Sequence, residues 1–176
     1  VHRIDKDTSG LLVCAKNDKT HIALSAQLAN KECYRKYVAI ARGVFEHDEG
    51  IIDAPIGRDP KDRQKMTVTD KNSKEAITLF KVLKRFDDST LVRLELKTGR
   101  THQIRVHLKY INHPVLNDPK YGKAHLIDDS GQYLHAYYLS FIHPTLNKRL
   151  EFEIPLPFYM EEYIKRKENG YEPESL

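Results

Sequence analysis

Residues 90–111, TLVRLELKTGRTHQIRVHLKYI, change their hydrophobic period halfway along. Up to residue 97, apolar and charged side chains alternate, which predicts a strand with one buried face and one solvated face. Beyond Gly99, apolar residues recur at helical spacing behind Thr101, a candidate N-cap, which predicts a helix that ends at about residue 112. The apolar positions are Val92, Leu94 and Leu96 in the strand and Ile104, Leu108 and Ile111 in the helix. This stretch indicates a domain that mixes sheet and helix.

The segments on either side continue the mixed pattern. The predicted strands are residues 9–15, 36–41, 51–52, 66–68, 76–86, 133–142 and 150–154, and the predicted helices are residues 17–30 and 157–167. Turn sequences separate several of these strands, so the predicted fold is an α+β domain with a mixed, mainly antiparallel central sheet flanked by helices. No internal repeat or linker is found, and residues 1–176 are predicted to form a single domain.

Three of these segments carry specific predictions about burial. The apolar run at residues 9–15 predicts a buried strand. The helix at residues 17–30 has Asn17 or Asp18 as its expected N-cap, and its expected apolar face consists of Ile22, Leu24, Ala26, Leu28 and Ala29. The strand at residues 36–41 places Tyr37, Ala39 and Ala41 on one face and Lys36, Val38 and Ile40 on the other.

The composition is that of a soluble globular protein. Of its 176 residues, 40% are hydrophobic and 31% charged, which suits one domain with a core. No apolar run approaches the roughly 20 residues that span a bilayer, and the start lacks a signal-peptide pattern, so no membrane association is expected. Cys14 and Cys33 are expected to be free thiols in a reducing cytoplasm. The net charge of +4 is compatible with an RNA partner, and a monomer is expected.

A carboxylate flanked by cations stands just before the first predicted strand. Residues 2–10, HRIDKDTSG, place Asp5 between Arg3 and Lys6. Nearby positive charge can hold such a carboxylate ionised, which suits a nucleophile or a base. The alternative is an ordinary solvated turn, and composition alone favours that alternative.

A cluster of cations surrounds the start of the helix that follows Gly99. Residues 97–107, KTGRTHQIRVH, contain two arginines, a glutamine and two histidines. Helix N-termini attract anions and disfavour cations, so this placement favours anion binding over a merely solvated basic face. Tyr37, beside the small Ala39, could present its ring to a nucleobase, although tyrosine is common in strands.

Neither a metal nor a cofactor is expected. His102 and His107 are five residues apart, which spreads them around a helix, and the two cysteines have no zinc-ligand spacing. The eight glycines never cluster into a phosphate-binding loop.

Taken together, these segments resemble the pseudouridine synthases that modify large-subunit ribosomal RNA and tRNA. Residues 2–12, HRIDKDTSGLL, resemble the family's His-Arg-Leu-Asp-x-x-Thr-Ser-Gly-Leu motif, with Ile4 as a variant. Residues 35–39, RKYVA, are similar to its Lys-x-Tyr-x-Ala segment, with Arg35 in the lysine position. Residues 98–107, TGRTHQIRVH, closely match its third motif, and residues 118–122, 134–136 and 141–144 also fall where the family has similar segments.

The resemblance implies an enzyme that isomerises uridine to pseudouridine in ribosomal RNA or tRNA, without metal or cofactor. Asp5 would be the catalytic carboxylate, Arg105 would pair with it, and Tyr37 would stack on the target uracil. Arg3 would fill the space left by a flipped nucleotide or hold a phosphate. Further RNA contacts would come from Arg100, His102 and Gln103.

The family normally has several strands before its aspartate motif, often with a Lys-Pro-x-Gly segment. Here that motif begins at residue 2, so the chain is expected to lack the first part of its catalytic domain. Losing those strands would expose a sheet edge, and the activity of this piece does not follow from the resemblance.

Two other functions compete with this one. The first is a non-catalytic RNA-binding module of the same fold, which would not need the combination of Asp5, Tyr37 and Arg105. The second is a glycoside or nucleoside hydrolase that uses Asp5 and Asp7 as paired carboxylates.

Overall fold

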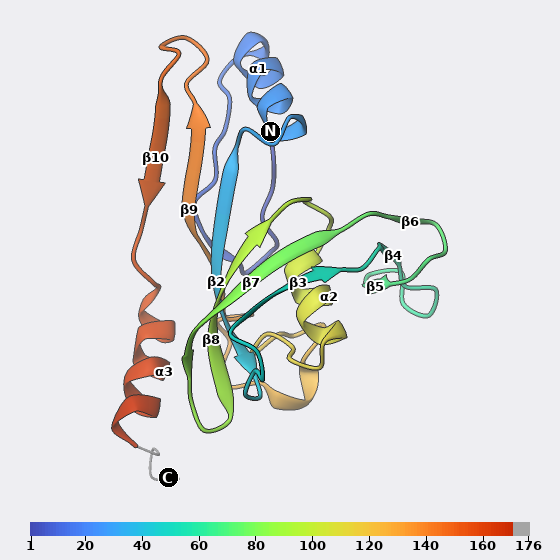
Figure 1. Cartoon of the computed structure of the whole chain (residues 1–176), viewed down its shortest axis with the longest axis vertical. Helices are drawn as coiled ribbons and strands as arrows, with labels where there is room; N and C mark the ends of the chain where they lie inside the picture. The colour runs from blue at the N-terminus through green and yellow to red at the C-terminus, as the bar shows by residue number, and fades with distance from the viewer. Residues whose placement is uncertain (171–176) are drawn as a thin grey trace.

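The computed structural model describes residues 1–170, which form two sheets and three α-helices (Figure 1). The strands are β1 (Ser9–Gly10), β2 (Tyr34–Arg42), β3 (Glu49–Asp53), β4 (Ile56–Arg58), β5 (Met66–Val68), β6 (Ser73–Lys74), β7 (Ile77–Arg85), β8 (Ser89–Leu96), β9 (Leu134–Ile142) and β10 (Arg149–Glu153). The helices are α1 (Asp18–Ala29), α2 (Gln103–Tyr110) and α3 (Phe158–Asn169), with a short 3₁₀ turn at Lys123–His125. None of the helices in this described part is long and apolar enough to cross a membrane.

The main sheet has seven strands. Six of them follow the order β1-β9-β2-β8-β7-β3, and the seventh, β10, pairs with the part of β9 that follows its short pairing with β1. Only the short β1 pairs in parallel, with β9, and every other pair is antiparallel. A second sheet has the order β5-β4-β6 and lies near α2 (Figure 1). The prediction of an α+β fold with a mixed, mainly antiparallel sheet is therefore confirmed.

Strand β2 lies at the centre of the core because it pairs with both β8 and β9. Its predicted faces are confirmed: Tyr37, Ala39 and Ala41 pack in the cluster that includes residues of α2, whereas Val38 and Ile40 pack in the cluster that includes residues of α3. Helices α2 and α3 thus cover opposite faces of the sheet at β2. This arrangement fixes α2 firmly against the face that carries Tyr37.

The prediction of a buried strand at residues 9–15 is wrong beyond its first two residues. Gly10 has φ +119° and approaches β9 so closely that a Cβ atom would lie 2.2 Å from the carbonyl oxygen of Ala136. Leu11 still donates its N–H to that oxygen at 2.8 Å, but the chain then leaves the sheet. Leu12 is consequently 44% exposed. An apolar run predicts burial, but it does not reveal where a strand departs from its neighbour.

Helix α1 begins as predicted but does not bury the predicted face. Asn17 is the N-cap and accepts the N–H of Thr20 at 2.9 Å. The buried residues are Leu24 and Gln27, whereas Ile22 is 69% exposed. Gln27 decides the orientation, because its amide donates to the carbonyl of Ile142 at 2.7 Å and accepts the N–H of Ile142 at 2.8 Å. The hydrogen bonds between Gln27 and the backbone of β9, rather than the apolar residues of the helix, therefore decide which face of α1 is buried.

Candidate active site

Asp5 begins a tight turn that is anchored to the chain just before β9. The N–H of Thr8 donates to the carbonyl of Asp5 at 3.0 Å. The fully buried Gln132 donates its amide to the Lys6 carbonyl at 2.7 Å and to the Thr8 hydroxyl at 2.8 Å. One bond holds the backbone of the turn and the other holds the Thr8 side chain, so Gln132 anchors the turn that presents Asp5.

A glycine lets this turn dock. Gly131 has φ +79°, and a Cβ atom there would lie 2.3 Å from the Cβ of Asp7. Beyond the turn, the Ser9 hydroxyl lies 2.7 Å from Nδ1 of His135. Nε2 of that histidine donates to the carbonyl of Pro155 at 2.9 Å, so Nδ1 accepts the Ser9 proton.

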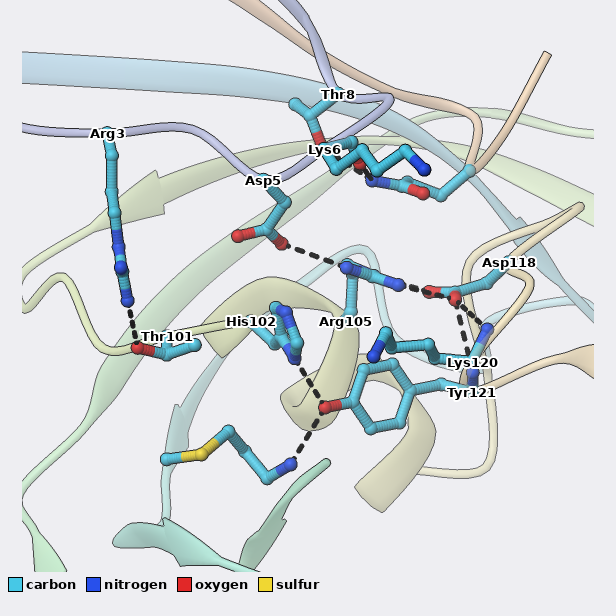
Figure 2. A network of polar contacts seen from close by, with 12 residues as sticks. Arg3, Asp5, Lys6, Thr8, Thr101, His102, Arg105, Asp118, Lys120 and Tyr121 are labelled. Atoms are coloured by element: carbon cyan, nitrogen blue, oxygen red, sulfur yellow. Dashed lines mark hydrogen bonds and ion pairs between the residues drawn. The ribbon is translucent and has the colours of Figure 1, made fainter. Parts of the chain in front are cut away.

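Arg105 reaches Asp5 from the buried helix α2 and lies between two carboxylates (Figure 2). Its Nη1 donates to Oδ2 of Asp5 at 3.2 Å. Its Nε and Nη2 donate to Oδ2 and Oδ1 of Asp118 at 2.7 and 2.8 Å. The side chains of Asp5, Arg105 and Asp118 are 21%, 4% and 0% exposed. Burial disfavours the charge of Arg105, but the hydrogen bonds and charge of Asp118, assisted by Asp5, raise the pKa of the guanidinium.

Asp118 contacts the predicted site residue Arg105, although the sequence suggested no role for it. It lies in an irregular stretch, just after residues that contact β2. Its carboxylate also accepts the N–H groups of Lys120 and Tyr121, at 2.9 and 3.1 Å. Four donors therefore converge on one fully buried carboxylate. The available signal was its place in the segment 118–122 that resembles a family motif, but the sequence alone does not show which cation it binds.

His102, and not Thr101, is the N-cap of α2, so the predicted cap is wrong. Gln103 holds the preceding loop instead, because its Oε1 accepts the hydroxyl of Thr98 at 2.7 Å and the N–H of Arg100 at 2.9 Å. The Thr101 hydroxyl is engaged elsewhere and accepts Nη2 of Arg3 at 2.8 Å.

His102 has φ 55°, a left-handed conformation that costs energy for a residue with a Cβ atom. Its Nδ1 lies 2.7 Å from the Tyr121 hydroxyl, which accepts the N–H of Met66 at 2.9 Å (Figure 2). Burial lowers the pKa of His102, and the positive charge of Arg105 acts in the same direction while Asp5 opposes it. A neutral imidazole accepts the tyrosine proton at Nδ1 and keeps its own hydrogen on Nε2.

The predicted site residues converge on one small cavity. Its volume is about 50 Å³, far below the roughly 300–1,000 Å³ of small-molecule sites, so side chains at its mouth must move before a nucleobase can enter. Burial raises the pKa of Tyr37, which therefore stays protonated at neutral pH. Six of the seven predicted residues line this cavity: Arg3, Asp5, Tyr37, Arg100, His102 and Gln103. Arg105 is the exception, because it does not line the cavity but binds Asp5.

All four predicted RNA contacts form hydrogen bonds within the protein, those of Arg3 and His102 being the bonds to Thr101 and Tyr121 described above. Gln103 is 3% exposed, and its Nε2 donates to the Ile77 carbonyl at 3.0 Å and to the Thr78 hydroxyl at 2.9 Å. Arg100 donates its Nε–H to the backbone carbonyl of Glu75 at 2.7 Å, and its other guanidinium N–H groups have no hydrogen-bond partner within residues 1–170. An RNA contact for either residue stays a prediction, and the geometry favours a supporting role for Gln103. Within residues 1–170, no group of three or more His, Cys, Asp or Glu side chains could hold a metal ion.

Comparisons with known proteins bear on this arrangement. The family model described as RNA pseudouridylate synthase matches residues 1–110. The uncharacterized RNA pseudouridine synthase YlyB of Bacillus subtilis is 58% identical over 171 residues, which cover 97% of this chain and 56% of that protein. The ribosomal large subunit pseudouridine synthase D of Zymomonas mobilis is 44% identical over 174 residues, covering 94% of this chain and 55% of that protein.

The solved structure of human RNA pseudouridylate synthase domain containing 1 has a TM-score of 0.79 and 25% identity, and the match covers 98% of this chain and 81% of that one. The chain spans about half the length of the curated relatives it matches. The family model covers more than half of the chain, and several relatives share more than two fifths of its residues. The chain therefore belongs to the RNA pseudouridylate synthase family.

Proposed function

We propose that this chain is the catalytic domain of an RNA pseudouridine synthase that uses Asp5 to isomerise uridine. One observation carries the proposal: Asp5 is the carboxylate that lines the cavity beside Tyr37, and a buried guanidinium holds one of its two oxygens. Oδ2 accepts Nη1 of Arg105, whereas Oδ1 has no hydrogen bond among the described residues. A carboxylate held at one oxygen and free at the other can direct the free oxygen at a substrate carbon.

The reaction needs no redox change and no water. Cleavage of the bond between N1 of uracil and C1′ of ribose frees the base, which rotates and reattaches through C5. The proton on C5 is lost and a proton is gained at N1, so atoms and charge balance. Asp5 would drive the cleavage, either as a nucleophile at C1′ or as a base, while Arg105 keeps it ionised and aimed. Tyr37 would stack on the base during its rotation.

The substrate would be ribosomal RNA or tRNA, with the target base flipped out of its stack at a cost of a few kcal/mol. Contacts from Arg3, Arg100 and His102 to the RNA would offset that cost, the arginines by binding phosphates. The small cavity fits a process in which the exposed Arg3, held by one hydrogen bond to Thr101, moves aside as the base enters. We also propose that the protein is cytoplasmic and monomeric.

The position of Asp7 disfavours the hydrolase alternative. Asp7 lies on the far side of the turn, with φ 68° and its Cβ against Gly131, and it does not line the cavity that contains Asp5. The two carboxylates therefore do not face a common substrate bond, as paired carboxylates of a hydrolase must.

Release of tritium from C5 of uracil in bulk ribosomal RNA and tRNA tests the proposal. The protein at its full natural length would be compared with its Asp5→Asn and Asp7→Asn variants, the second being a matched control in the same turn. We expect release by the parent protein and Asp7→Asn, and none by Asp5→Asn. Free uracil among the products would favour a hydrolase, and the absence of release by the parent on any RNA would favour a non-catalytic RNA-binding module.

A further inference from the structure

Arg35 is an unpaired cation in the wall of the candidate site. It belongs to β2 and lines the same cavity as Asp5 and Tyr37. Within residues 1–170, its guanidinium forms neither an ion pair nor a hydrogen bond, and its Nε is buried without a partner. Buried polar groups in folded proteins are nearly always hydrogen-bonded, so such a group requires an explanation.

Gly99 provides the surface on which this guanidinium rests. A Cβ atom at Gly99 would lie 3.0 Å from Nη2 and 3.3 Å from Nη1 of Arg35. Any other residue at this position would therefore crowd the guanidinium. The contact places the Arg35 guanidinium against the loop that leads into α2. Its charge acts locally: burial is the main cause of the raised pKa of Tyr37, and Arg35 opposes that rise.

The charges around the cavity are unbalanced. Three guanidinium groups line it, those of Arg3, Arg35 and Arg100, and Asp5 is the single carboxylate in the lining. Asp5 already faces the charge of Arg105. Arg3 and Arg100 donate to uncharged oxygens of Thr101 and Glu75, and neither forms an ion pair in the described part of the chain. The ligand that matches this lining is anionic.

We propose that Arg35, supported by Gly99, binds a phosphate group of the RNA strand beside the target nucleotide. The inference rests on the proposed function, because RNA is the anionic substrate that this function delivers to the cavity. The planar guanidinium fork matches the two non-bridging oxygens of a phosphate. Arg35 would thus fix the strand on the β2 side of the cavity, which Arg3 and Arg100 also line.

The salt dependence of RNA binding tests this assignment. Binding of a fluorescent single-stranded oligouridylate would be measured at several salt concentrations for the parent chain, Arg35→Met and Arg35→Lys. Arg93→Met is the matched control, since Arg93 is also a half-buried arginine of the main sheet but lines a different surface. We expect Arg35→Met to weaken binding about tenfold at low salt and to reduce the slope of log K against log salt by about 0.7, the value for one lost phosphate contact.

Arg35→Lys should keep the slope, because it keeps the charge, and lose part of the affinity with the fork. Gly99→Ala should weaken binding in the parent chain but not further in Arg35→Met. An unchanged slope for Arg35→Met, an equal loss for Arg93→Met, or no binding of the oligomer by the parent would overturn the assignment. None of these measurements requires isomerase activity, so they are independent of the tritium assay. Normal tritium release together with an unchanged slope would reject the Arg35 site and leave the proposed function intact.

Discussion

Asp118→Asn removes the charge that holds Arg105 while preserving the shape of the side chain. In the structure, Arg105 donates two hydrogen bonds to Asp118, at 2.7 and 2.8 Å, and a single longer one of 3.2 Å to Asp5. Removing one partner of a buried ion pair costs about 3–5 kcal/mol. Asparagine keeps one acceptor oxygen, so we expect a loss near 3 kcal/mol, a large part of the roughly 5–15 kcal/mol that stabilises a typical domain.

The same variant should impair catalysis more than RNA binding. Without its two bonds to Asp118, the Arg105 guanidinium can rotate, and Asp5 loses its fixed orientation. A displacement of about 1 Å in a reacting group can lower a rate about 100-fold. We therefore expect tritium release to slow about 100-fold under single-turnover conditions. Affinity for RNA should change little, since Arg105 does not line the cavity.

The assay compares urea unfolding and tritium release for Asp118→Asn, Asp5→Asn and the exposed control Asp129→Asn. Asp5 contributes one long bond from a partly exposed position, so Asp5→Asn should cost only about 1 kcal/mol of stability while abolishing the reaction. The two variants should thus rank in opposite order for stability and activity. If Asp118→Asn unfolds within about 0.5 kcal/mol of the parent and keeps its rate, Arg105 is not held by Asp118 and the reasoning is wrong.

Three further predictions concern Gly131 beside the turn, His2 and Tyr37. Gly131→Ala should lower both the stability, by about 2–3 kcal/mol, and the activity, because its Cβ would displace Asp7 and with it the turn that carries Asp5. Gly170→Ala, with φ +65° and nothing within 4 Å, should cost only about 1 kcal/mol. Equal losses in the two variants would contradict the docking of the turn on Gly131. Burial, followed by the positive charge of Arg35, lowers the pKa of His2 from 6.5 to about 4. Because the folded value is the lower one, stability should be complete above pH 6.5 and fall as the pH drops toward 4. The full difference corresponds to about 3 kcal/mol, which partial exposure reduces to about 1–2 kcal/mol, and urea midpoints of His2→Asn should show a flatter pH dependence. Tyr37→Phe should keep the unfolding midpoint, since no hydrogen bond to its hydroxyl is found within residues 1–170, and tritium release by this variant measures what the hydroxyl adds to stacking.

Most of the fold could be predicted because its hydrophobic periods are clear. The strand near residues 90–97 alternates clearly, those near residues 36–41, 76–86 and 133–142 are rich in apolar and aromatic residues, and each is found close to its predicted bounds. Local periodicity does not report long-range backbone contacts, which decided the two errors of burial. The chain leaves the sheet just after Gly10, whose backbone has φ +119° and lies close against β9, and α1 turns its face to satisfy the backbone at Ile142.

The site could be predicted only in part, for the same reason. The motifs on the N-terminal turn, β2 and α2 identified side chains that the fold does bring to one cavity. Asp118 has no periodic context, and its importance depends on a guanidinium 13 positions earlier in the chain. Gln103 is the opposite case. The sequence predicts that it contacts RNA, but its side chain is hydrogen-bonded to the loop before α2 and to β7.

Helix α2 carries glutamine, arginine and histidine, yet every residue from Gln103 to Leu108 is buried. We therefore expect its amide hydrogens to exchange with solvent mainly through unfolding of the whole domain. The turn at residues 5–8 is held by fewer hydrogen bonds than α2, and Arg3, Lys6 and Asp7 are exposed. Its amides should therefore exchange with solvent through local opening. One wall of the site is thus as rigid as the core, and the other can adjust. Substitutions in the adjustable wall should therefore leave undisturbed the helix whose Arg105 binds Asp5.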